Sequence, residues 1–370
     1  MNGCAVSLTG DPITVGHRDI IKRANAMFGR VVVLLARDSS KKGSLLSYAD
    51  RKALVECALR EDGLSNFEVR QIEGTVVDCA KAAGVGVIVR GLRNEQDLVY
   101  EMDMSAINHL IMPDIETVYL PCRPSLSYVS SSAVRELARL GKFDIAAKFS
   151  SVDAAMRLKR RLTKTVAITG GIACGKSVAQ RIFESRGWMG IDCDELNREL
   201  LDDVEYCCDV IEEVKKLGGG DVRDVHSFGV DRKKLAAAVF GSAEIKKAVE
   251  KLAFPAIAKK LDKKLSCCDC GQPFRVVVQA PLLFDDSAER FPFDFDRTVC
   301  ITSSSAEQTR RMTEDRGYSA AEASARLASQ MPPDEKAGRC DYVLRNDGSL
   351  ADFEKAVNGL IDRIEEDMGK

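Results

Sequence analysis

The first third of the chain alternates short apolar runs with longer amphipathic stretches. The apolar runs predict strands at Cys4–Leu8, Val31–Ala36, Phe67–Gln71, Val85–Val89 and Thr117–Leu120. The amphipathic stretches predict helices at about His17–Phe28, Tyr48–Arg60, Val76–Ala83, Glu95–Leu110 and Ala133–Leu140. This alternation predicts a doubly wound α/β domain with a parallel sheet, in which a ligand binds beyond the carboxyl ends of the strands.

A second alternation of the same kind begins near residue 165. Apolar runs predict strands at Val166–Thr169, at the segment that ends in Gly190–Asp194, and at Arg275–Ala280, Thr298–Ile301 and Asp341–Leu344. The intervening Ser150–Lys164 has apolar positions at helical spacing and a basic face, so an amphipathic helix explains it more simply than a patch for RNA or lipid. We therefore expect two doubly wound domains with parallel sheets, residues 1–162 and 163–370.

The composition agrees with a globular protein and limits the classes of partner that it could bind. Of the 370 residues, 45% are hydrophobic and 30% are charged, which is enough apolar material for two buried sheets. The net charge of −2 provides no general attraction to nucleic acid or to an anionic membrane, and no apolar run approaches the length of a membrane span. The thirteen cysteines lack a disulfide framework, so we expect reduced thiols and a cytoplasmic location. Cys267, Cys268 and Cys270 are spaced closely enough for zinc, but a thiol-rich loop is the simpler interpretation.

Thr165–Ser177 reads T-V-A-I-T-G-G-I-A-C-G-K-S, the pattern of a phosphate-binding loop between a strand and a helix. Gly170 and Gly175 let backbone N–H groups close around a polyphosphate. Lys176 supplies a cation for the β- and γ-phosphate oxygens, and the Ser177 hydroxyl is a candidate ligand of Mg²⁺. A helix predicted at Val178–Ser185 completes the motif. The motif predicts an ATP-using domain, and the alternative is a glycine-rich turn that matches by chance.

Two carboxylates, Asp192 and Asp194, follow the second strand of this half. On extended backbone, residues two positions apart point to the same side, so we expect both carboxylates to face the γ-phosphate. A carboxylate there can accept a proton from an alcohol or help to hold Mg²⁺. Further along, Arg310, Arg311 and Arg316 follow a late strand, which suits a lid over the transferring phosphate. A solvated helix face is the alternative for these arginines.

Polar residues also gather where the strands of the first half end. His17 lies in the first turn of a helix after the first strand, where the imidazole and the helix N-terminus can face the same anion. Lys41 and Lys42 follow the second strand, and further clusters follow the fourth and fifth strands at Arg90–Arg93 and Tyr128–Ser132. Each cluster alone is compatible with a solvated surface or a capping turn. Together at one edge of a sheet, they predict a polyphosphate site.

Over residues 3–162, the motifs T-G-D-P-I-T-V-G-H, S-K-K, R-G-L-R, Y-E-M and V-S-S-S closely resemble the bacterial phosphopantetheine adenylyltransferases. In that family the phosphate of 4′-phosphopantetheine attacks the α-phosphorus of ATP, giving dephospho-coenzyme A and pyrophosphate. The resemblance implies that His17 stabilises the pentavalent phosphate and that Lys41 and Arg90 hold the attacking phosphate. It places Thr9 at both ligands and Val76 at the substrate. It assigns to ATP the residues Gly10, His17, Gly91, Leu92, Arg93, Glu101, Tyr128, Val129, Ser130, Ser131 and Ser132.

One stretch departs from the adenylyltransferase pattern. The family usually reads G-T-F-D-P where this chain has Leu8-Thr9-Gly10-Asp11-Pro12. Leu8 puts a bulky side chain where a backbone should approach phosphate, which we expect to weaken binding. Because His17, Lys41, Arg90 and the serine cluster are retained, we expect activity, with a degenerate scaffold as the alternative.

Residues 165–365 resemble the dephospho-coenzyme A kinases through T-G-G-I-x-x-G-K-S, I-D-x-D, P-L-L and N-D-G, in this order. That family transfers the ATP γ-phosphate to the ribose 3′-hydroxyl of dephospho-coenzyme A, and Asp194 aligns with its catalytic base. The resemblance makes Lys176 catalytic and places the acceptor at Asp192 and Asp194. It assigns to ATP the residues Gly170, Ala173, Cys174, Gly175, Lys176, Ser177, Val178, Arg311 and Asn346. The departures are Phe254 for a usual His, Asp285 for a usual Glu, and Asp315-Arg316 for a usual Arg-Asp pair.

The product of the first reaction is the substrate of the second. We therefore predict a bifunctional transferase with two Mg·ATP sites, whose partners are the small molecules ATP, 4′-phosphopantetheine and dephospho-coenzyme A. The adenylyltransferase family commonly forms hexamers, so the resemblance also implies a homo-oligomer through the N-terminal domain. Two alternatives stay open. One is a kinase with an inactive N-terminal ligand-binding domain, and the other is a nucleotide-sensing protein without turnover.

Overall fold

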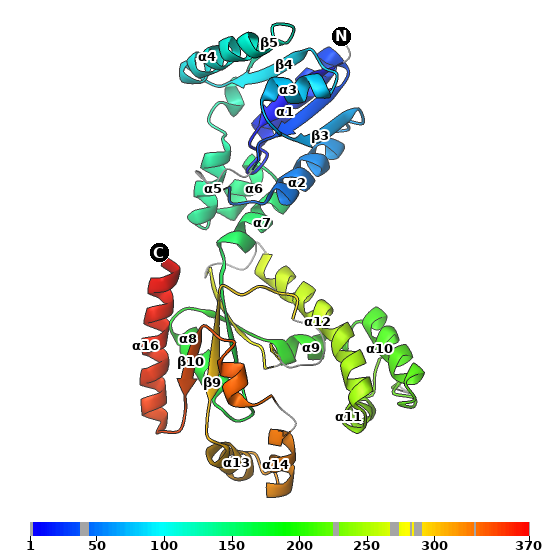
Figure 1. The fold of residues 1–370 in the computed structure, drawn as a ribbon, viewed down its shortest axis with the longest axis vertical. Helices are drawn as coiled ribbons and strands as arrows, with labels where there is room; N and C mark the ends of the chain where they lie inside the picture. The colour runs from blue at the N-terminus through cyan, green and yellow to red at the C-terminus, as the bar shows by residue number, and fades with distance from the viewer. Residues whose placement is uncertain are drawn as a thin grey trace. The chain divides into compact units, whose positions relative to one another are not determined.

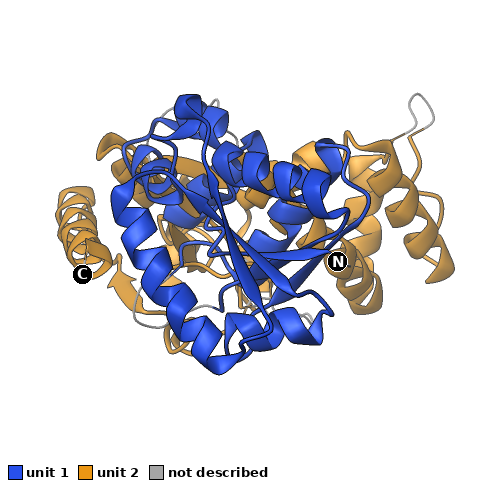
Figure 2. Cartoon of the chain, turned by 90° about the horizontal axis from the view of Figure 1, so that it is seen from above, with its two compact units in different colours: residues 1–162, 266–272 blue, residues 163–265, 273–370 orange. Residues whose placement is uncertain are grey.

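The computed structural model describes residues 3–37, 44–224, 229–266, 274–281, 283–284, 291–328 and 331–369. The chain divides into two compact units: unit 1 is built on residues 1–162, and unit 2 on residues 163–265 and 273–370 (Figure 2). Each unit has its own five-stranded sheet with flanking helices (Figure 1). All paired strands in both sheets are parallel, which confirms the predicted fold class. Among the described residues, no helix has the length and apolar character needed to cross a bilayer.

The sheet of unit 1 has the strand order β3-β2-β1-β4-β5. Its strands are β1 (Cys4–Leu8), β2 (Val31–Leu35), β3 (Phe67–Gln71), β4 (Val87–Leu92) and β5 (Glu116–Pro121). The chain builds outward from β1 to β3 and then crosses to the other side of β1 to add β4 and β5. This reversal opens a crevice beyond the carboxyl ends of β1 and β4, where doubly wound sheets bind ligands.

Helices cover the sheet of unit 1, and most of them begin at a residue that can cap a helix. They are α1 (Val15–Phe28), α2 (Tyr48–Glu61), α3 (Val76–Ala82), α4 (Glu95–Ile111), α5 (Ser131–Arg139), α6 (Phe143–Phe149) and α7 (Val152–Leu162), with a short 3-10 helix at Pro124–Leu126. The side chains of Thr14, Ser47, Thr75, Asn94 and Ser130 each accept a backbone N–H in the first turn of the helix that follows. These caps satisfy backbone donors that helix formation leaves without partners.

Both faces of the unit 1 sheet are buried. Ala5, Val32 and Ile88 pack with Val77 and Ala80 of α3 on one face. Residues one position further along each strand, Val6, Val33 and Val89, point to the opposite face and are also buried. Burial on both faces explains why these strands are continuous Val- and Ile-rich runs instead of alternating patterns.

The sheet of unit 2 has the strand order β10-β9-β6-β8-β7. Its strands are β6 (Lys164–Gly170), β7 (Met189–Asp192), β8 (Arg275–Gln279), β9 (Arg297–Thr302) and β10 (Tyr342–Arg345). The central strand β6 leads directly into the phosphate loop, and the order of strands reverses between β6 and β8. The loop therefore opens at the switch point of the sheet, as the motif predicts.

The helices of unit 2 form two cores against this sheet. They are α8 (Lys176–Ser185), α9 (Cys193–Leu200), α10 (Val204–Lys216), α11 (Arg232–Gly241), α12 (Ala243–Ser266), α13 (Ser305–Glu314), α14 (Ala320–Ala328), α15 (Pro333–Ala337) and α16 (Leu350–Gly369). Helices α8 and α16 pack on the face that carries Val166 and Ile168. Helices α9, α10 and α12 pack on the face that carries Ala167 and Val276.

Several boundaries differ from the sequence predictions. Strand β4 spans Val87–Leu92 instead of Val85–Val89, because its polar carboxyl end pairs with β5 as regularly as its apolar part. The segment predicted as extended through Asp194 turns into helix α9 at Cys193, because Asp192 caps the helix. Helices α5 and α8 begin at Ser131 and Lys176, two residues before the predicted starts. The sequence patterns also predicted no helix at α6, α11, α12, α14, α15 or α16.

Candidate functional sites

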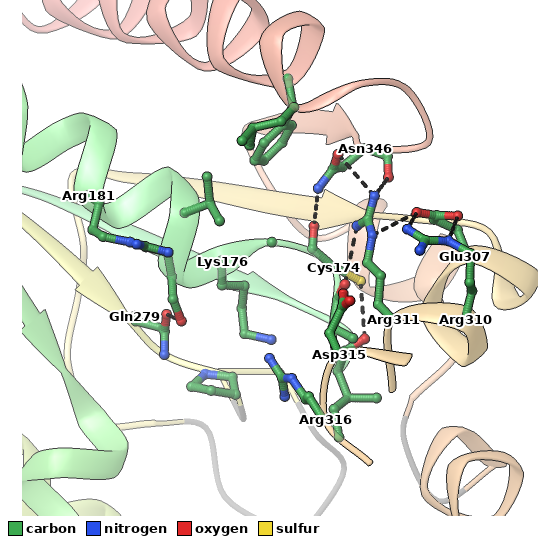
Figure 3. Close-up of a pocket in the computed structure, with 18 of the residues that line it drawn as sticks. Cys174, Lys176, Arg181, Gln279, Glu307, Arg310, Arg311, Asp315, Arg316 and Asn346 are labelled. Atoms are coloured by element: carbon green, nitrogen blue, oxygen red, sulfur yellow. Dashed lines mark hydrogen bonds and ion pairs between the residues drawn. The ribbon is translucent and has the colours of Figure 1, made fainter. Parts of the chain in front are cut away.

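The larger of the two candidate sites is a cavity of about 980 Å³ in unit 2, which Figure 3 shows in close-up. The predicted ATP residues Ala173–Val178 line it, together with Arg311 and Asn346. Lys176 and Asp194 line the same cavity, although they come from the first turns of two different helices, α8 and α9. Gly170 lies just below the loop, where a Cβ would stand 2.1 Å from the carbonyl oxygen of Ile301 and φ is +137°. Only glycine fits this close crossing of β6 and β9.

Three consecutive carbonyl groups of the phosphate loop are bound from outside by side chains. Gln308 donates to the Ile172 oxygen at 2.8 Å, Arg311 to the Ala173 oxygen at 3.3 Å, and Asn346 to the Cys174 oxygen at 2.8 Å. Gln308 also contacts the buried sulfur of Cys174 at 3.1 Å. With its carbonyl oxygens held on the outer side, the loop can turn its N–H groups toward a bound polyphosphate.

Arg311 and Arg310 are neighbours on α13 with different surroundings (Figure 3). Arg311 reaches the loop and also donates to the backbone oxygen of Asn346 at 3.0 Å. Arg310 pairs with Glu307 and Glu314 on its own helix, at 2.7 Å each. Arg310 lines the cavity but makes its hydrogen bonds only within its own helix, whereas Arg311, which also pairs with Glu307 at 2.9 Å, is part of the framework of the loop.

Lys176 lines the cavity where a phosphate would bind, but its side chain hydrogen-bonds to the loop itself in this structure. Its Nζ donates to the backbone oxygens of Gly170 and Gly171 at 3.1 and 2.7 Å. Burial lowers the pKa of Lys176, nearby Lys336 and Arg316 lower it further, and Cys174 and Asp194 counteract this effect. Phosphate oxygens would replace the two carbonyl contacts and favour the charged form of the lysine.

The two carboxylates at the end of β7 and the start of α9 lie differently from the prediction. Asp192 caps α9 by accepting the backbone N–H of Asp194 at 2.8 Å, so the two side chains do not share one side of an extended strand. Asp194 lines the cavity from the first turn of α9. Desolvation by the cavity walls raises the pKa of Asp194, and the neighbouring Asp192 raises it further, against the opposing effects of Lys176 and Arg198. A carboxylate with increased proton affinity suits a general base.

The second candidate site is a cavity of about 550 Å³ in unit 1, at the switch point between β1 and β4. Predicted residues that line it are Thr9, Gly10, His17, Arg90, Gly91 and Arg93. Glu101 and Val129–Ser132 complete this set from α4 and from the start of α5. Three of the four predicted clusters therefore meet at one edge of the sheet, and the fourth, at Lys41 and Lys42, lies outside the described residues.

His17 is held in a capping box at the start of α1. The backbone N–H of Thr14 donates to His17 Nδ1 at 3.2 Å, and the backbone N–H of His17 donates to Thr14 Oγ1 at 3.3 Å. Because Nδ1 accepts a backbone proton, the neutral ring carries its own proton on Nε2. Burial lowers the pKa of His17 to about 4, with further contributions from Arg93 and Arg90. At neutral pH the residue is thus an uncharged Nε2–H donor that lines the cavity.

Arg90 is fixed by a buried carboxylate. It donates to Glu101 through Nε at 2.6 Å and through a second short contact, and to the backbone oxygen of Ser7 at 2.5 Å. Glu101 is only 9% exposed, so the pair is a well-desolvated, two-pronged ion pair. Arg93 pairs with Asp97 at 2.9 Å on the more open side of the cavity. The predicted ATP-side residue Glu101 therefore orients Arg90.

Three residues that sequence reasoning missed hold the loops of this cavity. Arg51 is fully buried and donates to the backbone oxygens of Thr9 and Ala36 at 2.6 and 2.9 Å, which ties the ends of β1 and β2 together. Asp11 accepts the backbone N–H groups of Leu45 and Leu46 at 2.9 and 3.0 Å. Arg135 of α5 donates to the Asp11 backbone oxygen at 2.6 Å. The loop after β1 is therefore connected to both α2 and α5.

A few predicted residues lie elsewhere. Lys41 falls outside the residues that the structure describes, as do Asp285 and the cysteines at 267, 268 and 270. Val76 is the first residue of α3 and packs against the core under that helix, away from the lining of the cavity. Leu92 and Tyr128 adjoin lining residues without lining the cavity themselves, and Tyr128 packs edge-on against Phe149.

Comparison with known proteins identifies both halves. A family model of dephospho-CoA kinase matches residues 164–352, and one of cytidylyltransferase-like proteins matches residues 9–137. In its N-terminal region, the chain is 40% identical over 133 residues to a phosphopantetheine adenylyltransferase of Methylococcus capsulatus, covering 36% of this chain and 80% of that protein. It is 44% identical over 137 residues to one of Streptococcus pneumoniae, covering 37% of this chain and 82% of that protein.

Solved structures include a similar kinase. A dephospho-CoA kinase from Campylobacter jejuni aligns with a TM-score of 0.39 and 25% identity, covering 55% of this chain and 97% of its own. The sequence and family comparisons confirm both resemblances that the motifs predict. The chain belongs to the phosphopantetheine adenylyltransferases through its N-terminal region and to the dephospho-CoA kinases through residues 164–352.

Proposed function

We propose that this chain carries out the last two steps of coenzyme A biosynthesis, with the adenylyltransferase in residues 1–162 and the kinase in residues 163–370. The observation that carries the proposal is that the two units belong to families with consecutive reactions, and that each unit has a cavity lined by its family's motif. Both reactions transfer a phosphorus group between oxygens. Each site therefore has to position two reactants and stabilise negative charge.

In unit 1, a phosphate oxygen of 4′-phosphopantetheine attacks the α-phosphorus of ATP, and the bond to the β-phosphate oxygen breaks to release pyrophosphate. His17 donates its Nε2 proton as a hydrogen bond to the α-phosphate, whose oxygens gain charge in the transition state. Arg90 and Arg93 contribute positive charge, and the N-terminus of α5 at Ser130–Ser132 presents backbone N–H groups to the triphosphate. No covalent intermediate with the protein is needed.

In unit 2, the ribose 3′-hydroxyl of dephospho-coenzyme A attacks the γ-phosphorus of ATP, and ADP leaves. Asp194 accepts the proton of the attacking hydroxyl, which its raised pKa favours. Lys176 leaves its two loop carbonyls and pairs with the β- and γ-phosphate oxygens. The framework made by Gln308, Arg311 and Asn346 keeps the loop in the form that binds phosphate.

The proposal includes Mg²⁺ as the partner of ATP. The donor set fits this ion: Ser177 offers one hydroxyl oxygen beside the phosphate loop, while the described residues contain no cluster of three or more His, Cys, Asp or Glu suited to a metal. Mg²⁺ in such sites is held by few protein oxygens together with phosphates and water. When bound, it neutralises charge on the transferring phosphate.

Self-association through unit 1 is also part of the proposal. Helix α4 exposes large apolar side chains along most of its length, among them Val99 at 63%, Ile107 at 49% and Leu110 at 83%. Soluble monomers rarely expose contiguous apolar patches of this kind. The occupant that we propose is α4 of a second copy, because an isologous contact buries both patches at once. A cytoplasmic location is proposed from the cysteines, since those that the structure describes are free thiols.

A single assay with the purified chain tests both activities. The chain is incubated with 4′-phosphopantetheine and Mg·ATP, and dephospho-coenzyme A, coenzyme A, ADP and pyrophosphate are followed. We expect pyrophosphate first and ADP with coenzyme A afterwards. If supplied dephospho-coenzyme A is phosphorylated but no pyrophosphate forms from 4′-phosphopantetheine, the chain is a kinase with an inactive first unit.

A further inference from the structure

Gln279 is a polar residue at the carboxyl end of a strand that is otherwise apolar in its core. It follows Val276–Val278 in β8, lines the kinase cavity and is only 6% exposed. A buried carboxamide destabilises the fold unless its donors and acceptors are satisfied. Its contacts therefore reveal why the position is polar.

The side chain of Gln279 bridges two groups of the site. Its Nε2 donates to Asp192 Oδ2 at 3.0 Å, and its Oε1 accepts the Ser177 hydroxyl at 3.1 Å. The other oxygen of Asp192 accepts the backbone N–H of Asp194. Rotating the amide by 180° would place its oxygen against the Asp192 carboxylate, so the carboxylate selects the orientation.

This orientation determines what the Ser177 hydroxyl can do. Its hydrogen is directed to Gln279, so its lone pairs stay available on the side of the cavity. The hydroxyl is therefore prepared to act as a ligand for a cation. Through Asp192, the same amide is also connected to the first turn of α9, which carries Asp194.

We propose that Gln279 is a positioning residue for the part of the kinase site that would bind Mg²⁺. It holds the Ser177 hydroxyl in the orientation that accepts Mg²⁺ and keeps that ligand in register with the helix that carries Asp194. The inference rests on the proposed kinase function. Partners of metal ligands typically change metal affinity or activity by about 10–100-fold when they are removed.

The test uses the full chain and compares Gln279→Leu with the wild type. Calorimetry measures the affinity for ADP without metal and with Mg²⁺. We expect Gln279→Leu to bind ADP alone as the wild type does, and to lose about 10–100-fold of the gain in affinity that Mg²⁺ provides. The Mg²⁺ concentration for half-maximal phosphorylation of dephospho-coenzyme A should rise, while pyrophosphate release by unit 1 is unchanged.

A second variant separates positioning from a general packing role. In Gln279→Glu combined with Asp192→Asn, the carboxylate accepts the Ser177 hydroxyl, and the Asn amide donates to the carboxylate while its oxygen still caps α9. This pair should recover most of the Mg²⁺ effect that Gln279→Leu loses. The proposal is overturned if Gln279→Leu retains the full Mg²⁺ effect, or if it loses ADP binding equally with and without metal. A wild type that binds Mg·ADP but does not phosphorylate dephospho-coenzyme A would instead contradict the proposed function.

Discussion

The side chain of Leu8 fills the space beside Gly10 that a side chain on Gly10 would need. A Cβ on Gly10 would lie 3.1 Å from Leu8 Cδ1 and 3.0 Å from Leu35 Cδ2, and Gly10 has a φ of +64°. The usual family pattern has Gly and a bulky Phe at these two positions, whereas this chain has a bulky residue and Gly. The two departures therefore compensate for each other: the side-chain volume that the family has at position 10 is supplied in this chain by Leu8.

This relationship predicts that Leu8→Gly weakens the first unit. Leu8 is half-buried and lines the cavity of unit 1, so the variant widens that cavity beside Gly10, and we expect a loss of about 1 kcal/mol in stability with no large gain in pyrophosphate release. Gly10→Phe alone should lower the stability further, because the new side chain would clash with Leu8 and Leu35. The double variant should recover stability toward that of the wild type. Thermal unfolding and pyrophosphate release measure both effects. A large gain in rate for Leu8→Gly alone would instead show that Leu8 blocks the site.

The pKa of His17 can be measured directly, because the chain has only three histidines. We expect the His17 ring to titrate near pH 4, well below the ordinary value of 6.5, because it is buried near Arg93 and Arg90. The unfolded chain binds a proton at higher pH than the folded chain, so this residue lowers stability as pH falls from about 6.5 to about 4. NMR of the ring Cε1–H group, assigned with His17→Gln, gives the midpoint. A midpoint near 6.5 would contradict the buried, neutral donor.

Arg311 and Arg310 offer a matched pair for the phosphate loop. Arg311→Lys loses the guanidinium group whose N–H donors bind both Ala173 and Asn346. We expect the affinity for ATP to fall by about 10-fold, the equivalent of one or two hydrogen bonds. Arg310→Lys keeps a cation at the cavity wall and changes only contacts with Glu307 and Glu314 on the same helix, so we expect a clearly smaller loss of affinity. Calorimetric titration with a non-hydrolysable ATP analogue compares them. Equal effects of the two variants would remove Arg311 from the framework of the loop.

Asp194→Asn should separate the two activities. It removes the proposed base, so we expect phosphorylation of dephospho-coenzyme A to fall by about 10²–10⁴-fold while ATP binding and pyrophosphate release persist. Because the pKa of Asp194 is raised, the wild-type kinase rate should begin to fall at a higher pH on acidification than an ordinary Asp would give. Glu195→Gln, the exposed neighbour on α9, is the control. Unchanged output in Asp194→Asn would favour the nucleotide-sensing alternative.

Charges placed on α4 should reduce self-association. Leu110→Glu puts a carboxylate on the most exposed apolar residue of the proposed contact, so we expect a smaller assembly in sedimentation velocity experiments. Met27→Glu on α1 changes a residue of similar character that is 53% exposed outside the patch, and should leave the assembly intact. A wild type that sediments as a monomer at micromolar concentration would refute the contact.

Sequence patterns predicted the sheets better than the details of the sites. The strands Cys4–Leu8 and Phe67–Gln71 have the predicted bounds. Strands buried on both faces leave uninterrupted apolar runs, which are easy to recognise. The turn at Asp192 was missed because a capping Asp at the end of a short strand looks like a continuation of the strand.

The contacts of Arg51 and Gln308 were missed for a different reason. Arg51 is a buried cation in the first turn of α2, and Gln308 binds a loop more than a hundred positions away in sequence. Such contacts depend on the tertiary arrangement, which no local pattern encodes. Gln279 is an exception, since a lone amide that directly follows the apolar run Val276–Val278 is a local signal of polar partners at that end of the strand.

The buried position of Cys174 makes the thiol of the phosphate loop unreactive. The sulfur is 1% exposed and lies against the Gln308 amide, and burial raises the pKa of the thiol. Only a thiolate attacks electrophiles or peroxides at an appreciable rate. The cysteine that directly precedes Gly175 and Lys176 in this loop is therefore protected from alkylation and oxidation by its own packing.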